Sequence, residues 1–426
     1  MVIAARVVAF REQIFAWVNG EEGIPVPSDR FDAAAFRELY ASPAAHGRSE
    51  GAGLSDLFWY WLAPGPQVHQ EHLENGPRYD QAARTSRQVL AVPKPKVEEL
   101  ARRCAAGVLD ELPRKGITEV RLRDLMMPIW AEVYYELVFH EPCPRPVRDL
   151  IVANANDVVT ALKCTGLRHM RRRNRLTSYL KSRLGEVKAQ LPDLFSPDEQ
   201  AWYLQGAFFN TAVVQMSEAM THLLLAVAQH EKVQDRLVRE PDDNDYLDRV
   251  INEALRAFPL FGIAHRITTE DISVSGTTVH SGSVLLFNYA AYQNSGFEHP
   301  EAFDPDRWEH LSPKDVTFIP FGVTANRACP ARGVAPVSMR AVAREVLRRF
   351  ALASSVSHTR SIPHRGPCLL IDRRGEPPPT AALARMRRRD RREDVTRSLT
   401  QLVLGSYMVW DARRKALCRS YFKGRA

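Results

Sequence analysis

The sequence predicts a mainly α-helical fold with small β-sheets, an α+β chain in which most helices precede the strands. Three observations support this. Apolar residues recur at helical spacing from about residue 95 to residue 258. β-branched runs split by Gly276 and Gly282 then indicate short strands and hairpins. A proline-rich stretch follows, and it ends at a single cysteine, Cys329, ahead of a further helical pattern.

Composition restricts the class of protein. The chain has 426 residues, of which 45% are hydrophobic and 25% charged, as in ordinary globular proteins. The formal net charge of +8 is partly local, in clusters at 171–175 and 385–392. Such runs are usually solvated helix surface, and a docking face for an acidic protein or an anionic surface is the alternative. Nucleic-acid binding is not expected, because the sequence lacks zinc-finger, RNA-binding-sheet and basic-zipper motifs.

The cysteines and the apolar segments bear on the compartment. Six scattered cysteines without a CxxC pair indicate a reducing compartment. Arg6, Arg11 and Glu12 interrupt the apolar N-terminal segment, so it does not resemble a signal-peptide core. No stretch reaches the roughly 18 apolar residues of a membrane span. We therefore expect a cytoplasmic protein without a transmembrane segment.

The first half of the chain is expected to be helical after a mixed N-terminal region. An aromatic run, LSDLFWYWL, occupies residues 54–62. Helical patterns then cover residues 95–112, 117–141 and 145–185, the last broken near Gly166.

The longest helical pattern begins at a strong start signal. Ser196 is suited to the N-cap, Pro197 to the first helical position, and Glu199 to the third position of a capping box. Apolar residues then continue on most faces from Asp198 to about His230. This pattern predicts one long, buried helix that crosses the molecule.

The second half mixes element types. A helix from Asn244 to Phe258 ends at Pro259, and short strands follow. Helix returns at residues 335–350, and a strand pair is expected within 351–371. We predict a main domain at 1–376 and a basic extension at 377–426. The extension contains an amphipathic pattern expected to dock on the body, with a partner protein or a membrane surface as alternatives.

Three motifs carry the chemistry. Glu253 and Arg256, three residues apart, share one helix face, and Arg307 of the FDPDRW segment at 303–308 is suited to join them. A carboxylate shared by two arginines is a charge-assisted network that fixes a loop. In the third motif, Cys329 follows a loop of small residues that starts at Pro320 and precedes a helix, where backbone N–H groups would stabilise a thiolate.

In this order and spacing the motifs resemble the C-terminal signature of the cytochrome P-450 superfamily, atypical in some details. The resemblance is strong over residues 228–370, diffuse towards the N-terminus, and absent from the last fifty residues. It implies a triangular helical body around a buried haem b (iron-protoporphyrin IX).

The resemblance assigns roles by position. Cys329 resembles the thiolate ligand of the haem iron, in the loop that contains Phe321 and Gly322. Arg327 and Arg266 resemble partners of the haem propionates, with His265 as an assisting residue. The resemblance makes Glu253, Arg256 and Arg307 a structural triad. It further makes Arg84 and Arg87 candidates for propionate contact.

Two departures concern the cysteine loop. Phe321 lies eight residues before Cys329 where the family has seven, so the loop is one residue longer. Ala325 and Ala331 stand where glycines are usual, and Pro330 removes one N–H donor near the sulfur.

A third departure lies in the long helix, where the family has a small residue, glycine, an acid and threonine. An ungapped alignment places Ala212, Val214 and Gln215 at the glycine, acid and alcohol positions. A register one turn earlier brings in Asn210 and Thr211 instead. We prefer the ungapped register, in which ordinary proton relay is impaired because glutamine is not an acid.

The resemblance places a substrate pocket among apolar segments. Its candidate residues are Phe58, Trp59, Phe208, Phe261, Ile263 and Ile362. We expect a haem-thiolate oxidoreductase, most simply a monooxygenase acting on an apolar small molecule of specialised metabolism. The alternatives are a haem enzyme that uses peroxide or catalyses a rearrangement or dehydration, and a non-catalytic partner protein. Without a dinucleotide fingerprint, electrons are expected from a separate ferredoxin or flavodoxin.

Overall fold

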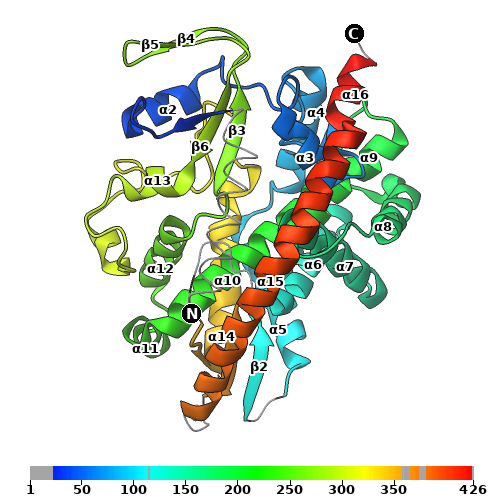
Figure 1. The fold of residues 1–426 in the computed structure, drawn as a ribbon. Helices are drawn as coiled ribbons and strands as arrows, with labels where there is room; N and C mark the ends of the chain where they lie inside the picture. The colour runs from blue at the N-terminus through cyan, green and yellow to red at the C-terminus, as the bar shows by residue number, and fades with distance from the viewer. Residues whose placement is uncertain (1–22, 114–115, 357, 359–364, 374–379, 425–426) are drawn as a thin grey trace.

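The computed structural model describes residues 23–113, 116–356, 358, 365–373 and 380–424. Helices make up most of the body, and short strands form small sheets at its edges (Figure 1). The helices are α2 (Ala33–Ala41), α3 (Gly53–Leu62), α4 (Pro77–Val89), α5 (Lys94–Asp110), α6 (Leu122–Phe139), α7 (Arg145–Leu162), α8 (Met170–Ser182), α9 (Pro197–Leu204), α10 (Val213–Gln229), α11 (Glu231–Arg239), α12 (Asn244–Ala257), α13 (Tyr289–Asn294), α14 (Ala335–Arg349), α15 (Thr380–Lys415) and α16 (Leu417–Lys423). The strands are β1 (Ile24–Val26), β2 (Ile117–Arg121), β3 (Ile263–Ile267), β4 (Ile272–Val274), β5 (Thr277–Val279), β6 (Val284–Asn288), β7 (Phe350–Ala353) and β8 (Pro367–Asp372).

The long helix lies at the centre of the core, as the sequence predicts. It runs from Pro197 to Gln229, and the capping box between Ser196 and Glu199 is formed. Its middle segment, Gln205–Ala212, is π-helical, which the sequence did not predict. Within the described chain, this helix is long and apolar enough to cross a membrane, but 78% of its apolar window is buried inside the protein.

Two of the sheets join distant parts of the chain. One has the order β1-β6-β3, and β4 and β5 form a separate hairpin. The other has the order β2-β8-β7, with Ile117 opposite Ile371. The predicted helix at 117–141 is therefore wrong at its start, because residues 117–121 form β2. Helical periodicity within the segment cannot reveal a strand partner some 250 residues away.

The C-terminal extension packs against the body. Met408 and Ala412 of α15 are buried in a cluster with Leu57 and Trp61 of α3. Tyr60 donates a hydrogen bond to Asp411 (2.8 Å), and buried Asp56 accepts one from Arg419 of α16 (2.6 Å). The expected docking on the body is thus present, through both apolar and charged contacts.

Candidate functional site

The loop before α14 holds Cys329 in a fixed position. The Cys329 N–H donates to the carbonyl oxygen of Phe321 (2.8 Å), which closes the loop. Gly322 adopts a left-handed conformation (φ +70°), and a Cβ atom there would lie 3.2 Å from the Tyr40 hydroxyl. A larger residue would therefore be strained at Gly322 and would crowd Tyr40.

The thiol of Cys329 is half-buried at the end of this loop. Burial raises its pKa to about 11, and the nearby backbone N–H of Ala331 acts in the opposite direction. Pro330 offers no N–H. The thiol is therefore neutral near pH 7 unless a bound cation stabilises its thiolate, as metal ions do.

Two arginines near Cys329, half-buried Arg327 and buried Arg266, have buried donor atoms without partners. Arg327 is held in a left-handed conformation (φ 55°), donates to the Leu73 carbonyl (2.6 Å) and stacks on Tyr79. Arg266 donates to the His265 carbonyl (2.8 Å) and to the Tyr40 hydroxyl (3.2 Å). Among the described residues, Nε and Nη2 of Arg327 and Nε of Arg266 have no hydrogen-bond partner. Buried guanidinium groups left in this way call for an anionic ligand.

These groups line one cavity. The space between the lining residues, its open mouth included, is about 1200 Å³. Most of the exposed surface of its lining is apolar, and polar side chains, Glu71 among them, supply the rest. The predicted site residues among its lining are Cys329, Arg327, Arg266, Phe321, Gly322, Thr211, Ala212, Gln215, Phe208 and Phe261.

The structure places the other predicted cofactor and proton-relay residues away from this lining. Val214 is buried in the core, and the buried Asn210 side chain is bonded to Asn154. Arg84 and Arg87 lie on the exposed face of α4. The helical rotation that turns these side chains away depends on packing, which motif spacing cannot specify.

The remaining candidates also lie outside the lining. His265 donates to the Arg48 carbonyl (2.9 Å), and Phe58 stacks on its ring. Trp59 donates to Ser49 (3.1 Å) and packs against Tyr421 of α16. Ile263 is exposed on β3. Ile362 lies outside the described residues.

A histidine that the motifs did not indicate completes the cavity. His69, from the loop after α3, is 6% exposed, and its Nε2 lies 2.8 Å from Oγ1 of Thr211. A Cβ atom at Gly206, in the π-helical segment, would lie 3.0 Å from Cδ2 of His69. The missing side chain at Gly206 therefore makes room for the imidazole ring. The signal in the sequence is weak, since histidine in a loop is common.

The hydrogen bonds around His69 define its tautomer. The Glu71 backbone N–H donates to Nδ1 (3.3 Å), so Nδ1 is the unprotonated nitrogen. Burial lowers the pKa of His69, which keeps the ring neutral. Nε2 then carries the proton and donates to Thr211. The Thr211 hydroxyl proton is left free to donate to an acceptor in the cavity.

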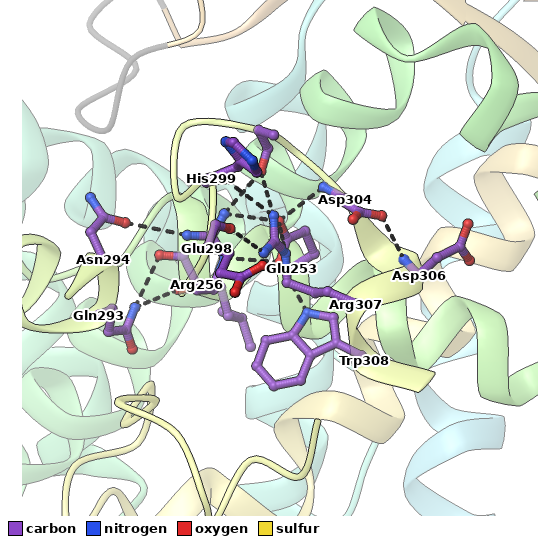
Figure 2. A network of polar contacts seen from close by, with 12 residues as sticks. Glu253, Arg256, Gln293, Asn294, Glu298, His299, Asp304, Asp306, Arg307 and Trp308 are labelled. Carbon is purple, nitrogen blue, oxygen red and sulfur yellow. Dashed lines mark hydrogen bonds and ion pairs between the residues drawn. The ribbon is translucent and has the colours of Figure 1, made fainter. Parts of the chain in front are cut away.

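The triad residues meet beneath this region in a complete network (Figure 2). Glu253 and Arg256 are fully buried, and Arg256 donates to both carboxylate oxygens of Glu253 (2.8 and 2.9 Å). Nε of Arg307 (3.3 Å), the Trp308 indole N–H (3.0 Å) and the Asp304 N–H (3.0 Å) also donate to that carboxylate. The network fixes residues 303–308 on α12, and it stands apart from the reacting groups.

Known proteins show the same combination of segments. The sequence profile of the cytochrome P-450 family matches residues 167–375. Cytochrome P-450 135B1 of Mycobacterium tuberculosis is 34% identical over 137 residues, which are 30% of this chain and 29% of that protein. Beta-amyrin 11-oxidase of Glycyrrhiza uralensis is 31% identical over 122 residues, which are 28% of this chain and 24% of that protein. The matched segments thus span less than a third of these relatives.

Solved structures share the fold over most of the chain. Retinoic acid-bound cyanobacterial CYP120A1 has a TM-score of 0.64 at 17% identity, covering 79% of this chain and 87% of that one. A variant of cytochrome P-450 OleT in complex with arachidonic acid has a TM-score of 0.66 at 14% identity, with coverage of 79% and 87%. The profile match over residues 167–375, the partly matching relatives and the shared fold all support the cytochrome P-450 superfamily.

Proposed function

We propose that the chain binds haem b with Cys329 as the axial ligand. In this proposal the protein is a haem-thiolate monooxygenase of an apolar small molecule in specialised metabolism. The observation that supports it most is the meeting of a half-buried thiol with the unpartnered donors of Arg327 and Arg266 in one cavity. A haem presents an iron that binds thiolate and two carboxylates that bind guanidinium groups, so these residues fit it.

Each group of the chain then has a defined task. Cys329 would hold the iron, with the Ala331 N–H nearby, and the two arginines would bind the propionates. When bound, the haem supplies activation of an oxygen species that thiolate donation favours. The Glu253 network holds residues 303–308 against α12 and stands apart from the cavity lining.

The apolar lining supports a lipophilic substrate. Phe208, Ala207, Met216, Leu260 and Phe261 line the cavity. Similar structures are bound to retinoic acid and to arachidonic acid, both long apolar molecules with a carboxyl group. A substrate of this kind would bury apolar surface and present an acceptor to a small number of polar groups.

Thr211 is the proton-bearing group best placed within the cavity. His69 donates to Oγ1, which leaves the Thr211 O–H directed to an acceptor in the cavity. Gln215 lines the same cavity and can donate a hydrogen bond, but it cannot act as an acid. The ungapped alignment thus contributes Gln215 to the lining, and the register one turn earlier contributes Thr211.

One observation favours the alternative chemistries. The predicted acid position, Val214, is apolar and buried, and the next acid along α10, Glu218, is paired with Arg123 and Lys163 (both 2.9 Å). Turnover with peroxide, or a rearrangement or dehydration, would reduce the need for an acid in the relay. For monooxygenase chemistry, a separate acidic ferredoxin or flavodoxin would supply electrons, and exposed Arg332 near Cys329 suits such a donor.

The absorption spectrum of the reduced, carbon monoxide-treated protein tests the proposal. Thiolate-bound haem should give the long-wavelength Soret band, and Cys329→Ala should abolish it. Cys143→Ala, at another half-buried cysteine, should keep it. If no haem binds, the non-catalytic partner reading replaces this one. Turnover with peroxide but not with reductase and dioxygen would select the alternative chemistry.

A further inference from the structure

The outer face of α15 carries an apolar stripe that the body does not cover. Its residues are Leu399 (49% exposed), Val403 (68%), Tyr407 (47%) and Trp410 (59%). Spacings of four, four and three place them along one side of the helix. The opposite side holds Met408 and Ala412, which are buried against the body. The stripe therefore does not contribute to the docking of α15.

The exposed charges of this helix have one sign. Its exposed charged residues are Arg385, Arg387, Arg388, Arg389, Arg391, Arg392, Arg413, Arg414 and Lys415. Its acidic residues, Asp390, Glu393, Asp394 and Asp411, are half-buried or buried. Glu393 pairs with Arg121 (2.8 Å), and Asp411 bonds Tyr60 (2.8 Å). What α15 presents to the surroundings is thus apolar in the middle and cationic at both ends.

Helix geometry places several of these cations on the same line as the stripe. At about 100° per residue, Arg385, Arg392 and Arg414 lie within roughly 20° of Val403 around the helix axis. Arg387 and Arg391 lie more than about 100° away by the same count. The order along the outer face is therefore cationic, apolar and cationic.

We propose that this face of α15, called the outer stripe, docks on an anionic lipid surface. Leu399, Val403, Tyr407 and Trp410 enter the boundary between headgroups and acyl chains, and the arginines at both ends contact anionic headgroups. Tryptophan and tyrosine suit this boundary because one part of each ring is apolar and another polar. The inference goes beyond the proposed function and does not depend on haem.

Charge disfavours a second copy of the chain as the occupant. A parallel pair of outer stripes would place each arginine beside its own copy. An antiparallel pair centred on Val403 would bring Arg414 near Arg392. Both arrangements set like charges opposite one another, although Arg414 is paired with Asp411 of its own helix (2.8 Å).

Shape favours lipid over an acidic protein. The stripe lies on the outer side of a single helix, with each of its four residues about half exposed or more. A protein partner would need a matching groove to bury this ridge, whereas a fluid lipid surface adapts to it. On such a surface the apolar side chains reach the acyl chains, and the arginines at both ends of the stripe stay at the level of the anionic headgroups.

Sedimentation of the full chain with vesicles tests the proposal. Binding is expected to phosphatidylserine-containing vesicles, to weaken as salt rises, and to be lost on pure phosphatidylcholine. Arg385→Gln with Arg392→Gln should weaken binding about 25-fold, at roughly fivefold per arginine. The matched pair Arg387→Gln with Arg391→Gln, which removes the same charge from another side, should have a much smaller effect.

The apolar part has its own variants. The double variant Val403→Asn with Trp410→Asn should reduce vesicle binding about tenfold or more. The single variant Trp410→Phe, which keeps Val403, should retain most of the wild-type binding. Because all these residues are exposed, circular dichroism should be unchanged. Equal loss from both arginine pairs would overturn the proposal, as would absence of vesicle binding. So would a dimer that the stripe variants dissociate, or selective binding to an acidic protein instead of vesicles.

Discussion

The Glu253 network and the Cys329 cavity are both buried polar regions, but only the first is complete. The Glu253 carboxylate receives five hydrogen bonds from Arg256, Arg307, Trp308 and the Asp304 N–H. Around Cys329, by contrast, Arg327 and Arg266 retain buried donors without partners among the described residues. A satisfied network fixes the fold, whereas unsatisfied buried donors indicate a ligand. The same chemistry thus separates a structural site from a binding site.

The largest effect should come from breaking the complete network. Glu253→Ala leaves Arg256, fully buried, without its counter-charge. The free energy of unfolding should fall by about 3–5 kcal/mol, measured by urea denaturation. Glu99→Ala is the matched control, because Glu99 and Arg102 form an exposed pair with the same three-residue spacing, and its effect on stability should be far smaller. Equal losses of stability in Glu253→Ala and Glu99→Ala would show that the buried network contributes no more than an exposed ion pair.

His265, which is buried and neutral, should make the free energy of unfolding depend on pH. Burial lowers the pKa of His265 from 6.5 to about 4, so below pH 6.5 the unfolded chain binds a proton that the folded chain does not. Stability from this group is complete above pH 6.5 and is lost as pH falls towards 4, by about 3 kcal/mol. Urea denaturation at several pH values should show a smaller acid loss in His265→Gln. Exposed His280→Gln should keep the wild-type dependence.

Removing an unsatisfied donor should affect the ligand more than the fold. Arg327→Met should weaken haem retention about 30-fold, close to 2 kcal/mol for lost bonds to a charged group. The haem-free protein should lose little stability, because two donors of Arg327 have no partner there. Haem titration and urea denaturation separate the two quantities. Arg332→Met, exposed near the same loop, should change neither, and a loss confined to the haem-free fold would contradict the assignment.

The smallest effect concerns the pair that spans the cavity wall. His69→Phe and Thr211→Val should each lower the free energy of unfolding by about 1 kcal/mol. The double variant should lose less free energy of unfolding than the two single variants together, because each single variant already removes the same 2.8 Å hydrogen bond. Strict additivity in this double-mutant cycle would show that the two side chains do not interact. Both single variants should bind a cavity ligand with a hydrogen-bond acceptor more weakly than the wild type does. Their affinity for the same ligand without the acceptor should be unchanged.

Local sequence predicted much of the fold, because the responsible interactions are local. The capping box at Ser196 and Glu199 forms as expected, and the helix it starts runs to Gln229. Glu253 and Arg256 meet because residues three apart on a helix share a face. The cysteine motif could also be recognised from the sequence, because its loop and the helix after it are adjacent in the chain.

Rotation and distant pairing were not predictable in this way. The sequence could not show that Val214 turns into the core while Thr211 and Gln215 face the cavity, because helical spacing does not say which face of the helix meets a cavity. Nor could it show that β2 pairs with β8. In each case the deciding contact comes from another part of the chain.

The sequence by itself determined the helical order, the acid–arginine pair, the cysteine loop and the excess of arginine in the last fifty residues. Only the tertiary structure decided which donors stay unsatisfied around Cys329, that His69 reaches Thr211 across 142 positions, and which side of α15 faces outwards. The physical reason is that spacing fixes neighbours within one element. Burial and hydrogen-bond satisfaction depend on everything packed around it.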